Sequence, residues 1–313
     1  MNNKIRITIV GAGGVGGYFG ARLIQGGADV GFVARGAHLA ALREHGLRVH
    51  SRLGEIHLPK VRAAEDAAAL GTAEYIFICV KLWDSEKAIQ GALRAAGPET
   101  AFISFQNGVQ KDDLLRRMVG EKRVIGGVGY IGSKIESPGV IAHTGTMQRL
   151  VFGEYDGTKS PRVTALYEAC VRGGIDAEVS TDIRLSIWEK FVFLVGLSAS
   201  TTAMRATLGP IVQNPATRAF LLDVMREVVV VGRAHGVRLP EDFAERRLAF
   251  CDSLPKEMDS SMHADLDSGK PLEINWLSGA VVELGQAAGV ATPMNRAVRD
   301  ILTLAAPGRN GAA

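Results

Sequence analysis

The stretch from Ile5 to Gly20 reads IRITIVGAGGVGGYFG, and it decides the fold. Residues 5–10 form an apolar, β-branched run that is typical of a buried strand. The next six residues have the spacing G-x-G-x-x-G: Gly11, Ala12, Gly13, Gly14, Val15 and Gly16. A helical pattern follows them, so the motif has the strand–turn–helix context of a dinucleotide-binding turn.

Each glycine of this turn has a physical role. Gly11 permits the tight turn, Gly13 lets the backbone approach a pyrophosphate, and Gly16 lets the helix pack on the strand. The N–H groups at the start of the helix favour the phosphates of a dinucleotide. The alternative is a glycine turn in another α/β fold.

Strand and helix patterns alternate around this motif through the first half of the chain. Further apolar strands are predicted at residues 29–34, 74–80 and 101–105, with helical patterns between them. Apolar strands separated by helices indicate a parallel sheet that is covered on both faces. Short strands with glycine and proline turns follow at residues 124–131, 139–143 and 148–152, and we expect them to be added antiparallel edge strands.

From residue 182 to residue 306 the pattern is helical almost throughout. We therefore predict an α/β protein with an N-terminal Rossmann-type parallel sheet and added edge strands, followed by an all-helical C-terminal domain. The predicted boundaries are 1–180 for the dinucleotide-binding domain and 181–313 for the helical domain.

Composition excludes several other classes of protein. The 313 residues carry a net charge of only +3, which gives no basic footprint for nucleic acid and no polybasic membrane anchor. Three widely spaced cysteines form neither a disulfide framework nor a zinc ribbon, and the seven histidines have no ligand spacing, so no metal is predicted. His263 is expected on a helix surface.

The longest apolar run without charge covers 14 residues from Phe191, whereas a spanning helix needs about 20. Residues 1–10 read as a strand rather than a signal peptide. We expect a cytoplasmic protein. Apolar runs at residues 228–231 and 281–282 are compatible with a homodimer.

The end of the second strand distinguishes NADP from NAD. An NAD enzyme usually has an acidic residue there for the ribose hydroxyl. In this chain Asp29 lies at the start of the strand, and Arg35 lies at its end, where a guanidinium can bind a 2′-phosphate in bidentate fashion. The pattern favours NADP, the alternative being that Arg35 is a surface residue.

Two of the 11 lysines are candidate functional residues. Lys81 directly follows the third strand, at the sheet edge where ligands bind in open α/β folds. Lys190 lies in an otherwise apolar helix, and a partly buried ammonium suits an acid that must give up a proton. The alternatives are a solvated loop charge for Lys81 and a surface-reaching or ion-paired side chain for Lys190.

With Lys190 included, the chain resembles the ketopantoate reductase (2-dehydropantoate 2-reductase) family over nearly its full length. The resemblance is carried by IVGAGGVGGYFGARL at residues 9–23, ARG at 34–36, VKLWD at 80–84, SFQNGV at 104–109, WEKF at 188–191 and SSMHADLDSGKPLEINWLSG at 260–279. The last segment is the most specific, because many dehydrogenases share the glycine turn.

The resemblance implies a role for each matching residue. Residues 11–16 would hold the NADPH pyrophosphate, with Arg35 on the 2′-phosphate and with Lys81 and Asn107 as further cofactor contacts. Asn107 would also lie near the substrate, and Lys190 would be the proton donor. Ser261 would bind the substrate carboxylate, and Glu273 would orient Lys190 and touch the cofactor. Taken singly, Asn107 could be a turn residue, Ser261 a helix N-cap and Glu273 a first-turn acid.

The chain departs from the family pattern on the helix of the catalytic lysine. Four and eight residues after Lys190, where the family has substrate-binding asparagines, stand Leu194 and Ser198. Both positions share one helix face with the lysine. Ser198, Thr201 and Thr202 could replace the asparagines in part, and the substrate of this chain could be a more apolar 2-keto acid.

The activity that the resemblance implies is NADPH-dependent reduction of 2-dehydropantoate to pantoate, in pantothenate biosynthesis. Three other readings stay open at this point: a reductase of a different 2-keto acid, a β-hydroxyacid or phosphogluconate-type dehydrogenase, and an NADPH-binding sensor without catalysis. The Ser261–Glu273 segment counts against the second reading, and the retained lysine and glutamate count against the third.

Overall fold

The structure is a computed structural model that describes residues 4–309 and divides into two compact units. Unit 1 extends to Gln106 and from Lys111 to Ile183, and unit 2 comprises Asn107–Gln110 and the chain from Arg184 onward. Each unit has its own apolar core.

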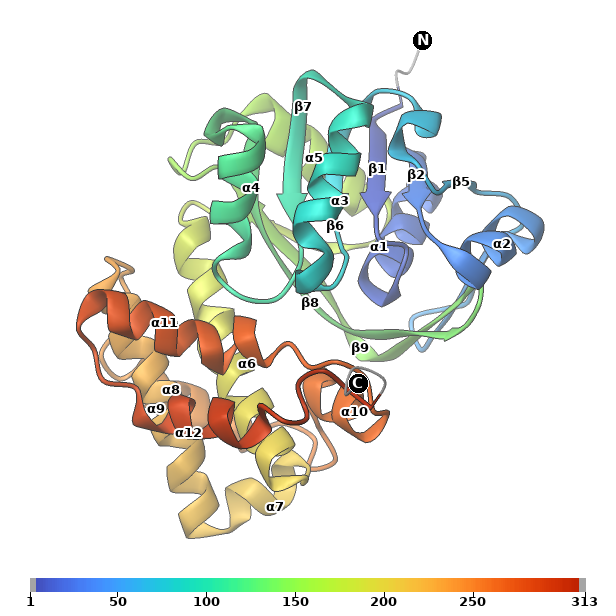
Figure 1. Cartoon of the computed structure of the whole chain (residues 1–313). Helices are drawn as coiled ribbons and strands as arrows, with labels where there is room; N and C mark the ends of the chain where they lie inside the picture. The colour runs from blue at the N-terminus through green and yellow to red at the C-terminus, as the bar shows by residue number, and fades with distance from the viewer. Residues whose placement is uncertain (1–3, 310–313) are drawn as a thin grey trace. The chain divides into compact units, whose positions relative to one another are not determined.

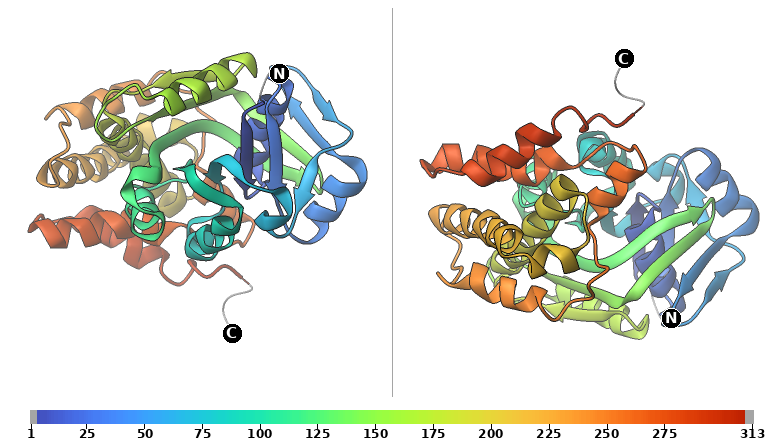
Figure 2. Two further views of the ribbon diagram at one scale, coloured as in Figure 1. Left: turned by 90° about the horizontal axis from the view of Figure 1, so that it is seen from above. Right: turned by 90° about the horizontal axis from the view of Figure 1, so that it is seen from below.

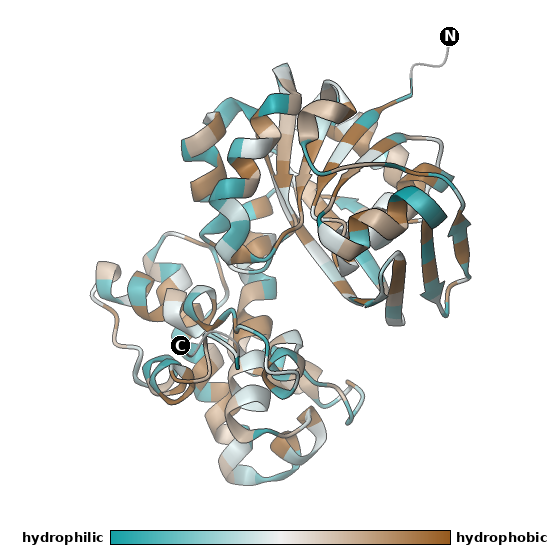
Figure 3. Cartoon of the chain, turned by 45° about the vertical axis from the view of Figure 1, so that its right-hand side comes forward, coloured by the Kyte–Doolittle hydropathy of each residue, from teal (hydrophilic) through white to brown (hydrophobic). Residues whose placement is uncertain are grey.

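The centre of unit 1 is a parallel sheet with strand order β7-β6-β1-β2-β5. Its strands in Figure 1 point the same way, and apolar positions dominate them in Figure 3. Helices from the connecting segments cover the sheet, and both faces carry buried clusters. These strands are β1 (Arg6–Val10), β2 (Asp29–Val33), β5 (Arg62–Ala64), β6 (Ala73–Ile78) and β7 (Ala96–Ser104). The α-helices of unit 1 are α1 (Gly14–Gln25), α2 (Gly36–His45), α3 (Ser85–Ala92), α4 (Lys111–Val119) and α5 (Pro161–Arg172). Short 3-10 turns are η1 (Ala67–Leu70), η2 (Leu82–Asp84), η3 (Leu93–Ala95) and η4 (Glu121–Arg123).

A long hairpin extends this sheet. Strand β8 (Val124–Ser137) pairs in parallel with β7 and antiparallel with β9 (Val140–Gly153), and the two green strands lie side by side in Figure 2. The strands predicted at 139–143 and 148–152 are thus one strand. They do not end the sheet, because β3 (Leu47–Ser51), β4 (Ile56–Leu58) and β10 (Asp176–Val179) continue the pairing beyond β9.

Helix α1 lies unusually close to the sheet. A Cβ atom added to Gly20 would stand 2.3 Å from Phe32 Cε1, and one added to Gly16 would stand 2.1 Å from the Gly11 carbonyl oxygen. Tyr18 and Phe19, between these glycines, are at most 1% exposed. Glycine spacing along α1 therefore sets the distance between the helix and the strands.

Unit 2 is helical, as predicted. Its elements are α6 (Ile183–Met204), α7 (Leu208–Gln213), α8 (Pro215–Ala234), α9 (Phe243–Cys251), α10 (Ser261–Asp267), η5 (Ile274–Trp276), α11 (Ser278–Ala288) and α12 (Pro293–Leu302). None of the helices in the described chain combines the length and apolar character that crossing a bilayer requires.

The valine runs at residues 228–231 and 281–282, which suggested a homodimer surface, lie mostly in the buried core of unit 2. Val228 and Val231 are fully buried, Val281 and Val282 are at most 2% exposed, and of the run at 228–231 only Val230 is exposed. The runs reflect the core of the helical unit, so they give no support to a homodimer.

The three cysteines are not disulfide-bonded. Burial raises the pKa of the Cys79 and Cys170 thiols to about 12 and that of Cys251 to about 11. Cys79 and Cys170 belong to unit 1, and Cys251 belongs to unit 2.

Gly20→Ala is expected to lower the melting temperature of the protein by several degrees. The added methyl group overlaps the Phe32 ring, and overpacking of this kind costs about 1–3 kcal/mol, which exceeds the gain in helix propensity. The matched control is Gly91→Ala in helix α3, where an added Cβ meets no atom within 4 Å. Thermal unfolding should show no loss for the control, and equal melting temperatures for both variants would contradict the close approach.

Candidate functional site

The glycine turn is tied to the carboxyl ends of its neighbouring strands. Gly11 has φ +102°, and the N–H groups of Gly11 and Ala12 donate to the Val33 carbonyl at 3.1 and 3.3 Å. A Cβ at Gly11 would stand 2.8 Å from the backbone of Cys79 and Val80, so only glycine fits there.

The start of α1 has the features of an anion site. Gly13 precedes it in extended conformation, and no side chain caps the first N–H groups of the helix. A Cβ added to Gly13 would meet nothing within 4 Å, so the backbone is open at this position, as the close approach of a phosphate requires. These residues fit a dinucleotide pyrophosphate.

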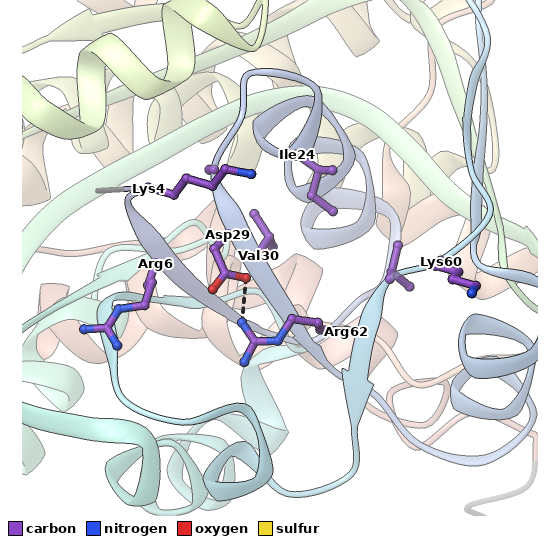
Figure 4. Close-up of a pocket in the computed structure, with 9 residues that line it drawn as sticks. Lys4, Arg6, Ile24, Asp29, Val30, Lys60 and Arg62 are labelled. Carbon is purple, nitrogen blue, oxygen red and sulfur yellow. Dashed lines mark hydrogen bonds and ion pairs between the residues drawn. The ribbon is translucent and has the colours of Figure 1, made fainter. Parts of the chain in front are cut away.

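Arg35 and Asp29 lie at opposite ends of β2. The strand register pairs Arg6 with Asp29 and Val10 with Val33, so Arg35 follows at the same sheet edge as the glycine turn. The Arg35 side chain is exposed at the start of α2. At the other edge, the Asp29 carboxylate accepts a hydrogen bond from Arg62 at 2.6 Å, in the hollow shown in Figure 4.

Lys81 stands at the same edge of unit 1, just after β6. It is half-buried and precedes the turn η2, and its Nζ lies 5.7 Å from the centre of the Trp83 ring. The structure therefore brings the glycine turn, Arg35 and Lys81 to the carboxyl ends of three adjacent strands.

His38 is a functional candidate that the sequence does not reveal. Its Nδ1 accepts the Gly139 N–H at 3.1 Å, which leaves Nε2 to donate to the Ala12 carbonyl of the glycine turn at 2.8 Å. This geometry needs the neutral ring. Burial lowers the pKa of His38 below 6.5, and the hydrogen bond to Ala12 opposes that shift in part. No motif marks the residue, because its partners are backbone groups distant in the sequence.

Asn107 and Lys190 meet within unit 2. The Lys190 ammonium donates a hydrogen bond to Asn107 Oδ1 at 3.0 Å, and the lysine side chain is half-buried. Lys190 lies on α6, whereas Asn107 belongs to the four-residue segment that follows Gln106. The two residues that the resemblance assigns to the reacting centre are thus in direct contact.

The helix face beyond Lys190 is only partly polar. Leu194 is half-buried against the core of unit 2, and Ser198 is 1% exposed. Ser198 Oγ and Thr202 Oγ1 have no hydrogen-bond partner among the described residues. Thr201 is not available in this way, because its hydroxyl bonds to the Leu197 carbonyl and to Ser260 Oγ.

The specific segment at 260–279 holds its residues in different environments. Ser261 is exposed at the start of α10, and the N-cap of this helix is Ser260, whose Oγ accepts the His263 N–H at 3.1 Å. His263 is 7% exposed, so its expected place on a helix surface is wrong: it lies on the inward face of a short helix. Glu273 is buried and directly precedes η5.

His38→Phe is expected to destabilise unit 1 by about 1–3 kcal/mol above pH 6.5, because it leaves the Ala12 carbonyl and the Gly139 N–H unpaired. The pKa of His38 is lowered in the folded protein, so its contribution is fully present above pH 6.5 and falls as the pH drops below that value.

The measurement is the difference in unfolding free energy between the wild type and this variant from pH 8 to pH 5. Other titrating groups are common to both proteins and cancel. A difference that stays constant over this range would show that the neutral ring is not required.

Comparisons with known proteins agree on one family. The model of the ketopantoate reductase PanE/ApbA family matches residues 7–157, and the model of its C-terminal domain matches residues 182–306. A 2-dehydropantoate 2-reductase of Mesorhizobium japonicum is 35% identical over 94% of this chain and 95% of its own length.

Solved structures show the same relationship. The crystal structure of 2-dehydropantoate 2-reductase from Geobacter metallireducens has a TM-score of 0.90 at 27% identity, covering 96% of this chain and 100% of that one. A D-mandelate dehydrogenase with NADH and anilino(oxo)acetate has a TM-score of 0.87 at 21% identity, covering 96% of this chain and 98% of that one, and it shows a shared fold. The chain belongs to the ketopantoate reductase family of oxidoreductases.

Proposed function

We propose that this protein reduces a 2-keto acid to a 2-hydroxy acid with NADPH, and that 2-dehydropantoate is the first substrate to test. The observation that carries the proposal is the hydrogen bond between Lys190 Nζ and Asn107 Oδ1. It places a cation beside a neutral amide in a half-buried position, as an acid for a carbonyl oxygen requires.

Lys190 and Asn107 have different roles in the proposed reaction. Bound NADPH supplies a hydride for the carbonyl carbon of the substrate. Negative charge then develops on the carbonyl oxygen, where the Lys190 ammonium stabilises it and donates a proton. The Asn107 amide oxygen accepts a hydrogen bond from the ammonium and so orients it for proton transfer.

The carboxyl ends of β1, β2 and β6 in unit 1 offer groups that could bind the cofactor. Gly13 and the start of α1 would hold the pyrophosphate, and Arg35 would hold the 2′-phosphate that distinguishes NADPH from NADH. Lys81 would add a further cofactor contact, and Asn107 would contact the cofactor near the nicotinamide and the substrate. Glu273, buried in unit 2, would orient Lys190, and Ser261 would bind the substrate carboxylate.

Helix α6 bears on which 2-keto acid is the substrate. Leu194 cannot hydrogen-bond a substrate hydroxyl, and a hydroxyl facing it would be left unpaired. Ser198 and Thr202 have buried hydroxyls that find no partner within residues 4–309, and they could accept or donate one such bond. A 2-keto acid with a more apolar chain than ketopantoate is therefore the second candidate.

Lys190→Ala is expected to lower kcat by about 10²- to 10⁴-fold, because the variant lacks the proton donor. NADPH binding, followed by fluorescence titration, should stay nearly unchanged. Wild-type turnover in this variant would exclude Lys190 as the acid, and an inactive wild type that binds NADPH would favour a sensor.

Arg35→Ala is the matched control for the binding measurement. Loss of the guanidinium should weaken NADPH binding and leave NADH binding unchanged, because only NADPH carries the 2′-phosphate. This control shows that the titration detects a lost cofactor contact.

A panel of 2-keto acids assayed with NADPH addresses the substrate. If the apolar face of α6 selects the substrate, ketopantoate should be reduced no better than the branched 2-keto acid of the same skeleton without the hydroxyl. Leu194→Asn should then raise kcat/KM for ketopantoate about tenfold relative to that analogue, because it supplies a partner worth about 1–2 kcal/mol. A wide preference of the wild type for ketopantoate would refute the apolar-substrate hypothesis.

A further inference from the structure

We propose that Gln106 and Lys111 are positioning residues that fix the Asn107 loop, the four residues Asn107–Gln110 between them, and that the reduction rate depends on both. The proposal rests on the proposed function of Asn107 and Lys190. Neither residue bonds to Lys190, and each acts through the backbone on its side of the loop. They stand where the chain leaves unit 1 and where it returns.

Gln106 anchors the outgoing side of the loop with every polar atom of its side chain. Its Nε2 donates to the Val80 carbonyl at 2.9 Å and to Ser85 Oγ at 2.7 Å. Its Oε1 accepts the Ser104 hydroxyl at 2.9 Å, and the residue is 7% exposed. One buried amide thus joins the end of β7, the chain after β6 and the start of α3.

Lys111 anchors the returning side with a saturated ammonium. Its Nζ donates at 2.9 Å to each of three oxygens, those of the Ser104 carbonyl, the Gly127 carbonyl and the Asp112 carboxylate. Asp112 also accepts the Tyr155 hydroxyl at 2.7 Å. Lys111 and Asp112 are 4% and 2% exposed, so the pair is buried and compensated, and loss of either partner would leave a charge unpaired.

Both anchors bind the same residue, Ser104, at the end of β7. Gln106 accepts a hydrogen bond from the Ser104 hydroxyl, and Lys111 donates one to the Ser104 carbonyl, so the two ends of the loop have little freedom relative to each other. Within the loop, Gly108 has φ +83°, a conformation that favours glycine. Asn107 is bonded directly to Gln106, so anchoring Gln106 restricts the backbone from which the Asn107 side chain extends.

The test compares Gln106→Met with Thr100→Val. Thr100 lies in the middle of β7, is 2% exposed, and uses its hydroxyl to join the Gly97 N–H and the Ala73 carbonyl. Both variants lose buried hydrogen bonds of unit 1, so similar falls in melting temperature are expected. Only Gln106→Met should lower kcat, by about 10- to 100-fold, because small displacements of a positioned group have effects of that size.

A double-mutant cycle separates positioning from simple loss of stability. In an Asn107→Ala background, Gln106→Met should lower kcat by less than about threefold, because the group that it positions is already gone. A full additional loss in that background would overturn the proposal, as would a Gln106→Met enzyme that retains the kcat of Thr100→Val.

Two milder variants keep the test usable if Gln106→Met does not fold. Ser85→Ala removes one of the Nε2 bonds, and Lys111→Met combined with Asp112→Asn removes the buried pair without stranding a charge. Each of these variants should also lower kcat. A wild type without reductase activity, or an active Lys190→Ala, would reject the proposed function.

The anchoring alone would be rejected if the wild type is active, Lys190→Ala is inactive and the variants at Gln106, Ser85 and Lys111 keep the wild-type kcat.

Discussion

The close approach of α1 to the sheet is the constraint on which unit 1 depends. Small residues at positions 16 and 20 let the helix lie against β1 and β2, where any side chain would overlap Phe32 or the backbone of the glycine turn. The same approach brings the helix start to the carboxyl ends of the strands, next to Arg35 and Lys81. The glycines that let α1 pack on the sheet therefore also place the start of α1 where a cofactor phosphate would bind.

Much of this architecture could be predicted from the sequence. The strand–glycine–helix pattern, the alternation that follows it and the helical second half are local signals, and each corresponds to an element of the structure. The predicted breaks in the 124–153 region and the unpredicted strands β3, β4 and β10 have another origin. These are short or partly exposed strands. β3 and β10 are stabilised by pairing with β9, and β4 by pairing with β3, so their neighbours in space determine them.

Some residues of the candidate site could be predicted from the sequence, and others could not. Lys190 and Asn107 stand out in the sequence through the family resemblance, and the structure joins them. His38 and Lys111 do not stand out, and Gln106 appears only within the SFQNGV segment, because all three bind other groups of the protein rather than a ligand. Such residues have no spacing rule: their partners are up to 101 positions away in the chain. The surface prediction for His263 failed, and the valine runs lost their value as an argument for a homodimer, for a related reason: residue type alone does not tell which side of a helix faces the core.

The distribution of the cysteines has a practical consequence. Each unit contains at least one thiol that is nearly fully buried, Cys170 in unit 1 and Cys251 in unit 2, and burial also holds both in the unreactive protonated form. Alkylation at either sulfur thus requires its surroundings to open. Each unit of the natural chain therefore carries its own thiol reporter of unfolding. Mass spectrometry of alkylated peptides can tell whether the two units unfold in one cooperative event or one after the other, without any engineered probe.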